Sequence, residues 1–169
     1  QTKYLEFIPR DQGGGGFVGE LSADDPNIAR ATRTGGKEIL PSGNELVKSD
    51  QHYCMLIGSD GLYQPVIVDM KSTQLSVSRR WKTQIAMLKV KDAQGVLKTP
   101  ALFGTVWRLT TVEQSNDMGT WYNWSVEKVK MIDDEALLQE AISFRKSVQK
   151  GEAKAVVEDH GEKAEDAPF

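Results

Sequence analysis

Aromatic and basic residues are interleaved in the middle of this 169-residue chain. Seven of its 13 aromatic residues lie between Tyr63 and Trp124, and these include all four tryptophans. Residues 71–130 contain ten basic and four acidic side chains, a net charge of +6, whereas the whole chain has a net charge of −3. Flat rings can stack on nucleobases, and nearby lysine and arginine can bind phosphates. These residue types therefore predict a surface that binds an anionic polymer with flat groups.

The candidate binding residues fall into a set of rings and a set of cations. Alternation along a strand over residues 101–112 places Phe103 and Trp107 on one face and Arg108 on the other, unless a bulge intervenes. Trp121 is opposite in parity to Tyr122 and Trp124, so rings occur on both faces. Trp81 is assigned to the core, because it shares a helical face with apolar residues. We expect base stacking by Trp107, Trp121, Tyr122 and Trp124, and phosphate contacts by Lys71, Arg79, Arg80, Lys82, Arg108, Lys128 and Lys130. The alternative is that the tryptophans fill the core and the charges form an ordinary solvated surface.

Several chemistries are excluded or disfavoured by composition. Cys54 is the single cysteine, so neither an intramolecular disulfide nor a cysteine-rich zinc site can form. The two histidines, His52 and His160, are far apart in sequence, which disfavours a histidine metal site. No apolar run approaches the roughly 18 residues of a membrane span. We therefore expect no catalytic residue, no metal, no cofactor and no membrane association, in a protein of the reducing cytoplasm.

The elements that must position these residues can be read from turns and periodicity. We expect strands over residues 2–10, 53–57, 62–70, 101–112 and 121–132, with hairpin turns at residues 58–61 and 114–119. Val77, Trp81, Ile85 and Leu88 form one apolar face of a helix over residues 72–88. A second helix is expected over residues 133–150, opened by acidic residues and closed by Gly151.

This order predicts a mainly β protein with α-helices (α+β). Five strands with one helix inserted after the third is the order of an OB-like barrel, here followed by a C-terminal helix. We expect one nucleic-acid-binding domain over residues 1–150, with a long, loosely ordered connection over about residues 11–50. Residues 151–169 carry six acidic and two basic residues and predict a disordered, flexible tail.

The last residues of the chain, EDAPF, place a phenylalanine next to the terminal carboxylate after several acids. This tip resembles the C-terminus of bacterial and phage single-stranded DNA-binding proteins, which end in acids followed by Pro-Phe or Phe. The resemblance implies that Asp166, Pro168 and Phe169 recruit replication and repair proteins of the phage or host, or that the tail covers the DNA groove.

Longer segments resemble a family of small bacteriophage proteins, most of unassigned function. They are KYLEFIPR at residues 3–10, GNELV at 43–47, MKSTQL at 70–75, SRRW at 78–81, RLTTV at 108–112 and GTWY at 119–122. This resemblance implies a phage origin more than a particular activity.

An enzyme is the main alternative. The segment VIVDMK at residues 66–71, with Asp60 upstream, is similar to the core of metal-dependent nucleases of the restriction and RecB-like type. In such a site Asp60 and Asp69 would hold Mg²⁺, and Lys71 would polarise the attacking water. A non-enzymatic phage interaction or virion component is a further alternative. We favour sequence-independent binding of single-stranded DNA in phage replication or recombination, without catalysis, and leave homo-oligomerisation open.

Overall fold

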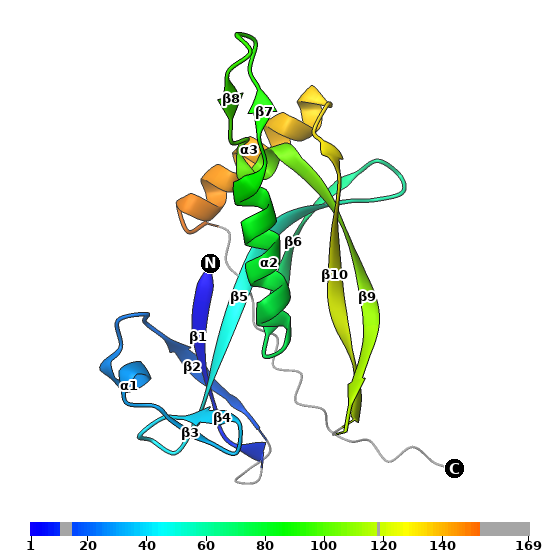
Figure 1. Cartoon of the computed structure of the whole chain (residues 1–169). Helices are drawn as coiled ribbons and strands as arrows, with labels where there is room; N and C mark the ends of the chain where they lie inside the picture. The colour runs from blue at the N-terminus through cyan, green and yellow to red at the C-terminus, as the bar shows by residue number, and fades with distance from the viewer. Residues whose placement is uncertain (11–14, 118, 153–169) are drawn as a thin grey trace. The chain divides into compact units, whose positions relative to one another are not determined.

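The computed structural model describes residues 1–10, 15–117 and 119–152 (Figure 1). Its contacts divide the chain into two compact units, one formed by Gln1–Ser49 and the other beginning at Asp50. Strands predominate, and three α-helices are present among the described residues, which confirms the mainly β, α+β class. The acidic tail lies outside the described residues.

The first unit is built from short strands around a small apolar centre. It contains β1 (Thr2–Phe7), β2 (Phe17–Leu21), α1 (Pro26–Ala29), β3 (Thr32–Thr34), β4 (Lys37–Ile39) and the beginning of β5 (Glu45–Ile57). The order in the sheet is β2-β1-β5-β4-β3, and Leu5, Leu40 and Leu46 are buried. Asp25 caps α1 by accepting a hydrogen bond from the backbone N–H of Asn27 at 2.8 Å.

The long, loose connection expected over residues 11–50 is corrected by these elements. Four strands or parts of strands and the single-turn helix α1 occupy most of its described part. Sequence reasoning missed β3 and β4 because each has only three residues, mostly exposed and polar, so neither shows alternation of apolar and polar side chains. Their pairing is set by neighbouring strands rather than by their own composition.

The second unit follows the predicted order closely. β5 turns at residues 58–61 into β6 (Tyr63–Lys71), which pairs with it, and α2 (Gln74–Met87) follows. A small hairpin of β7 (Val90–Lys91) and β8 (Leu97–Lys98) and the 3₁₀ turn η2 (Leu102–Gly104) lead to β9 (Thr105–Asn116), β10 (Gly119–Met131) and α3 (Glu135–Gln149).

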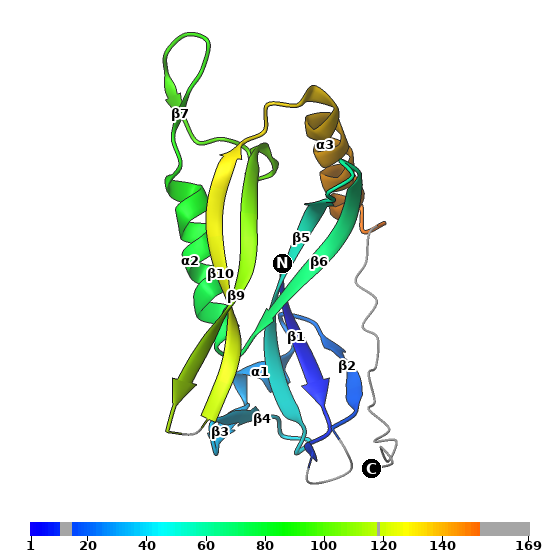
Figure 2. The same ribbon diagram turned by 90° about the vertical axis from the view of Figure 1, so that its right-hand side faces the viewer.

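Helix α2 provides the centre of the core. Val77, Trp81 and Ile85 are buried together with Met70 at the end of β6, which confirms three of the four residues of the predicted apolar face. The fourth, Leu88, is the half-buried, extended residue that follows the helix. Half-buried side chains from β5, β6, β9 and β10 pack against this cluster. In both ribbon views α2 runs beside β10 (Figures 1 and 2).

Strands β9 and β10 form a long antiparallel hairpin of their own. Their register pairs Trp121 with Gln114, Trp124 with Thr111, and continues to a bulge between Lys128 and Lys130. The turn is shorter than predicted, because β9 continues to Asn116 and β10 begins at Gly119, whose φ of 139° suits glycine.

The strands expected for the barrel are present as β1, β5, β6, β9 and β10. In the described part of the chain, however, β9 and β10 form a separate two-stranded sheet. Helix α3 begins as predicted: Asp134 accepts hydrogen bonds from the N–H groups of Ala136 and Leu137. No helix among the described residues is long and apolar enough to cross a membrane.

Candidate nucleic-acid interface

The β9–β10 hairpin has two unlike faces, because directly paired residues share a face and successive residues alternate. Its inner face packs on the α2 core through Trp107, Leu109, Trp124 and Val126. The opposite side, which we call the outer face, consists of Arg108, Thr110, Val112 and Gln114 on β9 with Trp121, Asn123, Ser125 and Glu127 on β10. Most of these outer residues are exposed.

Three of the tryptophans serve the packing of the core. Trp81 is 5% exposed, as assigned from the sequence, and its ring meets that of Trp107 edge-on at a centroid distance of 6.0 Å. Trp107 also donates its indole N–H to the hydroxyl of Thr105 at 2.8 Å. Trp107 and Trp124 are half-buried against the same cluster. Their rings therefore contribute first to holding α2 on the hairpin.

The other two predicted stacking residues, Trp121 and Tyr122, lie further along the hairpin and on opposite faces of it. Trp121 is half-buried on the outer face, and its indole N–H is buried with no hydrogen-bond partner among the described residues. Tyr122 is 64% exposed, and its hydroxyl donates to Glu113 at 3.2 Å. Of the four predicted stacking rings, those of Trp121 and Tyr122 are therefore the two outside the cluster that packs on α2.

Three of the seven predicted phosphate ligands already have a carboxylate partner. Lys71 pairs with Asp69 at 2.8 Å, Lys82 with Asp50 at 2.7 Å and Lys130 with Asp133 at 2.6 Å. The remaining four are exposed and make no ion pair in the described ranges. They are Arg79 and Arg80 on α2, Arg108 on β9 and Lys128 on β10.

The bulge in β10 changes the face of the hairpin on which Lys130, one of the seven predicted phosphate ligands, lies. Lys128 pairs with Trp107 on the inner face, whereas Lys130 pairs with Val106, which has the parity of the outer face. Without the extra residue Val129, Lys128 and Lys130 would share a face. The bulge thus places Lys130 on the same side as Arg108.

The predicted set does not form one continuous trough. Its members are divided between α2 and both faces of the hairpin. On the outer face, Arg108 and Gln114 are six residues apart on β9, and Gln114 pairs with Trp121, so cation and ring are about 20 Å apart along the strands. The structure therefore corrects the expectation that these residues form one binding surface, and leaves a narrower set on the outer face.

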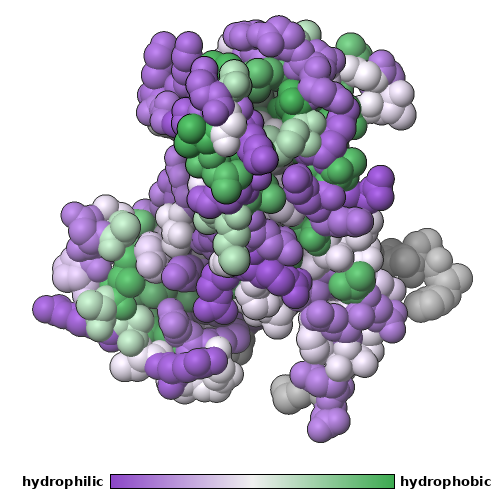
Figure 3. Space-filling view, turned by 45° about the horizontal axis from the view of Figure 1, so that its top comes forward, coloured by the Kyte–Doolittle hydropathy of each residue, from purple (hydrophilic) through white to green (hydrophobic). Residues whose placement is uncertain are grey.

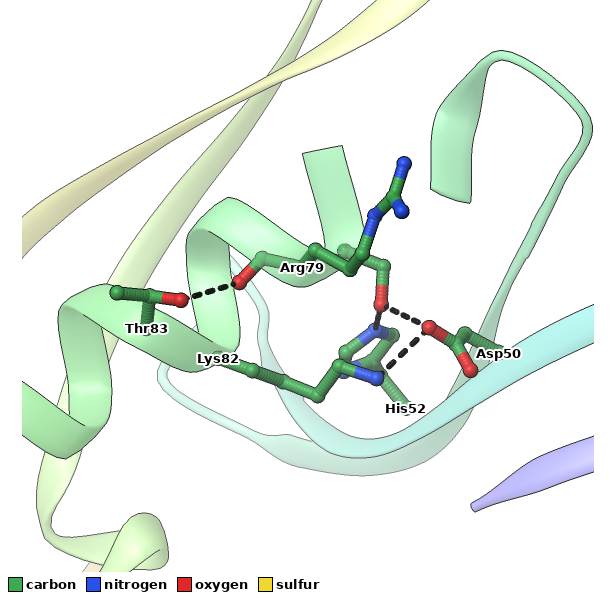
Figure 4. Close-up of polar contacts among 6 residues, drawn as sticks. Asp50, His52, Arg79, Lys82 and Thr83 are labelled. Carbon is green, nitrogen blue, oxygen red and sulfur yellow. Dashed lines mark hydrogen bonds and ion pairs between the residues drawn. The ribbon is translucent and has the colours of Figure 1, made fainter. Parts of the chain in front are cut away.

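A polar network that sequence reasoning missed joins β5 to α2 (Figure 4). The Ser78 hydroxyl donates to the Asp50 carboxylate at 2.6 Å, and Lys82 binds the same oxygen at 2.7 Å. Asp50 is 5% exposed and Ser78 is fully buried. The guanidinium of Arg79 points away from this cluster in Figure 4. Ser78 and Lys82 are four residues apart, next to the apolar face of α2. This spacing of two polar residues is the feature of the sequence that could have pointed to the network.

His52 completes this network as a neutral ring. Because the single Ser78 proton goes to Asp50, the His52 Nε2–H donates to Ser78 Oγ at 2.9 Å. The imidazole stacks on Trp81 with ring centroids 4.6 Å apart. Burial, reinforced by the charge of Lys82, lowers the His52 pKa from 6.5 to about 4, while Asp50 opposes this effect.

A second missed network lies on the outer face. Asn123 is 3% exposed, its Oδ1 accepts the backbone N–H of Trp124 at 2.8 Å, and its Nδ2 donates to Gln114 Oε1 at 3.1 Å. Burial of an amide in a hairpin could be inferred only from the three-dimensional arrangement.

The structure does not assemble the nuclease constellation. Asp60 accepts a hydrogen bond from the Leu62 N–H within its own turn. Asp69 lies toward the other end of β6, and the six residue steps from Tyr63 to Asp69 alone span about 20 Å. Among the described residues no three His, Cys, Asp or Glu side chains are grouped so as to hold a metal ion.

Exposed apolar side chains also occur in the second unit. Leu62, Met87, Leu97 and Leu102 are each more than 60% exposed. Figure 3 shows hydrophobic patches within a mostly hydrophilic surface. Exposed apolar side chains of this kind can contact another protein. Because Leu62, Met87, Leu97 and Leu102 belong to different elements, they do not by themselves define one contact surface.

Asp166, Pro168 and Phe169, the residues expected to recruit partner proteins, lie outside the described residues.

No curated protein and no solved structure matches the chain. The family model described as "Pam3 phage gp34-like protein" matches residues 1–154. This match supports the bacteriophage assignment made from the sequence. The chain therefore belongs to the Pam3 phage gp34-like protein family.

Proposed function

We propose that this phage protein binds single-stranded DNA, largely independently of sequence, during phage DNA replication or recombination. The outer face of the β9–β10 hairpin is the binding surface. The acidic tail, through Asp166, Pro168 and Phe169, recruits phage or host replication and repair proteins. The protein acts by binding, without catalysis.

One observation supports this function most. The outer face holds an aromatic ring, Trp121, and a guanidinium, Arg108, although α2 packs on the opposite face of the hairpin. Arg108 is exposed and makes no ion pair in the described part of the chain, so it can bind a phosphate without breaking an existing contact. Thr110 and Val112, which lie between Arg108 and Gln114 on the same face of β9, are also exposed.

An OB-like fold is part of the same proposal. In such a fold three consecutive strands pair side by side, a helix follows, and a final hairpin completes the barrel. In this chain β1, β5 and β6 correspond to the three strands and α2 to the helix. The described pairing supports the first part of this scheme, and β9 and β10 supply the hairpin. In OB folds oligonucleotides bind the face of the second and third strands, here β5 and β6, and loops that include the connection between the fourth and fifth strands, here the turn of the β9–β10 hairpin.

Affinity should fall as the salt concentration rises. Each phosphate contact contributes a slope of about −0.7 to the logarithm of the association constant against the logarithm of salt for a single strand. On the outer face, Arg108 alone gives a slope of about −0.7, and Lys130, which the bulge places on the same side, brings it to about −1.4 if it exchanges Asp133 for a phosphate. A slope near zero would contradict phosphate contacts.

Fluorescence anisotropy with a labelled single-stranded oligonucleotide, its duplex and Mg²⁺ tests the proposal. We expect the single strand to bind more tightly than the duplex, with no cleavage. Loss of one stacking ring in Trp121→Ala should weaken binding by about 5–150-fold, and Arg108→Gln should weaken it and lower the salt slope. Arg33→Gln, an exposed arginine on β3, is the matched control.

Two results would overturn the proposal. The first is no binding of single-stranded DNA at low salt by the folded protein. The second is wild-type affinity in both Trp121→Ala and Arg108→Gln. Cleavage that requires Mg²⁺ and disappears in Asp69→Ala would instead support the nuclease alternative.

A further inference from the structure

The buried amide of Asn123 has a fixed orientation. Its Oδ1 faces the backbone N–H of Trp124 at 2.8 Å, and a backbone N–H can only donate. The other end of the amide must therefore be the Nδ2 donor. Since an unsatisfied buried amide would be costly, these contacts make the orientation of Asn123 well determined.

Asn123 in turn fixes the orientation of Gln114. The Asn123 Nδ2 group lies 3.1 Å from Gln114 and needs an acceptor, so Gln114 must present Oε1 to it. The Nε2 group of Gln114 is then at the far end of its amide. Because Gln114 is exposed, this end is available to a ligand as a hydrogen-bond donor.

Gln114 also lies next to the Trp121 ring. The two residues are direct partners across the hairpin and share the outer face. Directly paired side chains in an antiparallel sheet have Cβ atoms about 5 Å apart. A base stacked on Trp121 would therefore have the Gln114 amide beside its edge.

We infer that Trp121, Gln114 and Asn123 form a one-base subsite that favours a base with a keto group at its outer edge. Trp121 stacks on the base, Gln114 Nε2–H donates to the keto oxygen, and Asn123 is a positioning residue that holds the Gln114 amide. This inference rests on the proposed function and adds a modest preference to otherwise sequence-independent binding.

The chemistry predicts uracil or thymine over cytosine. The edge of a pyrimidine furthest from its sugar carries position 4, which is a keto acceptor in uracil and thymine and an amino donor in cytosine. A donor from Gln114 meets an acceptor in the first case and another donor in the second. One hydrogen bond of about 1 kcal/mol corresponds to about a five-fold difference in affinity.

The test compares 12-residue oligodeoxyuridine with oligodeoxycytidine at pH 8, by competition in fluorescence anisotropy. Both are pyrimidine strands without a C5 methyl group, so backbone flexibility and methyl contacts do not dominate the comparison. We expect the wild-type protein to prefer oligodeoxyuridine about five-fold. Gln114→Ala should bring the ratio close to one, and Gln114→Glu, an acceptor, should reverse it.

The ratio is the readout, because a new carboxylate would weaken binding of both oligonucleotides. Gln84→Glu, at an exposed glutamine on α2, adds the same charge and should keep the wild-type ratio. Asn123→Asp removes the Nδ2 donor and should lower the ratio with the Trp121 ring still present. A thermal melt of each variant confirms that it is folded.

The possible failures are distinguishable. If neither oligonucleotide binds, the proposed function fails. If both bind with equal affinity, or if Gln114→Glu leaves the ratio unchanged, DNA binding stands and the keto-selective subsite is refuted.

Discussion

Replacing Ser78 with alanine removes a hydroxyl that holds two polar groups at once. The Ser78 Oγ–H donates to the Asp50 carboxylate at 2.6 Å and Oγ accepts the His52 Nε2–H at 2.9 Å. A buried hydrogen bond to a charged group contributes about 1.5–3 kcal/mol, and a neutral one about 1 kcal/mol. Lys82 still neutralises Asp50 in the variant. We therefore expect Ser78→Ala to lower the free energy of unfolding by about 3 kcal/mol.

Urea denaturation followed by tryptophan fluorescence measures this change in the relevant part of the molecule. All four tryptophans of the chain belong to the second unit, which also contains Ser78. The expected loss corresponds to a fall in Tm of roughly 6–12 °C for a chain of this size.

Ser76→Ala is the matched control. Ser76 lies on the same helix, and its exposed hydroxyl donates to the Thr73 carbonyl at 2.8 Å. Its loss should cost less than about 1 kcal/mol. If Ser78→Ala destabilised the protein no more than Ser76→Ala does, the polar network would not contribute to the attachment of α2, and this reasoning would be wrong.

Two further predictions concern buried titratable groups. Burial lowers the His52 pKa to about 4 in the folded state, so between about pH 6.5 and pH 4 the unfolded chain binds more protons and stability falls as the pH is lowered. Urea midpoints at pH 7 and pH 5 should differ less in His52→Gln than in wild type, and an unchanged difference would contradict the assignment. Burial raises the pKa of the Cys54 thiol to about 11, so iodoacetamide at pH 8 should modify native protein slowly and urea-unfolded protein readily, as measured by mass spectrometry. Rapid modification of the native protein would show that Cys54 is accessible.

Elements with a strong local pattern could be predicted from the sequence. The spacing of Val77, Trp81 and Ile85 identified α2 and its buried face, and Gly58 and Gly61 marked the turn between β5 and β6. The acidic start of α3 was also recognised, because Asp134 caps it. In each case residues close in sequence determine the local structure.

Features that depend on residues far apart in sequence could not be predicted. Lys82 was interpreted as a phosphate ligand, but it binds Asp50, which is 32 residues away. The inner position of Trp107 and Trp124 follows from the side of the hairpin on which α2 packs, and composition alone does not specify that side. Asn123 is buried, although asparagine is a residue type that is mostly exposed. Thus the residue types of the candidate site were visible in the sequence, whereas their division between core, ion pairs and outer face was not.

The bulge at Val129 has a consequence for how this strand can change in evolution. The residue is an extra one in the ladder, since Lys128 pairs with Trp107 and Lys130 with Val106. Its deletion would let β10 pair regularly with β9 and leave every contact from Gly119 to Lys128 in register. Most other one-residue deletions in β10 would reverse the orientation of a whole segment. Relatives of different length should therefore tolerate a gap at position 129 more readily than elsewhere in the hairpin.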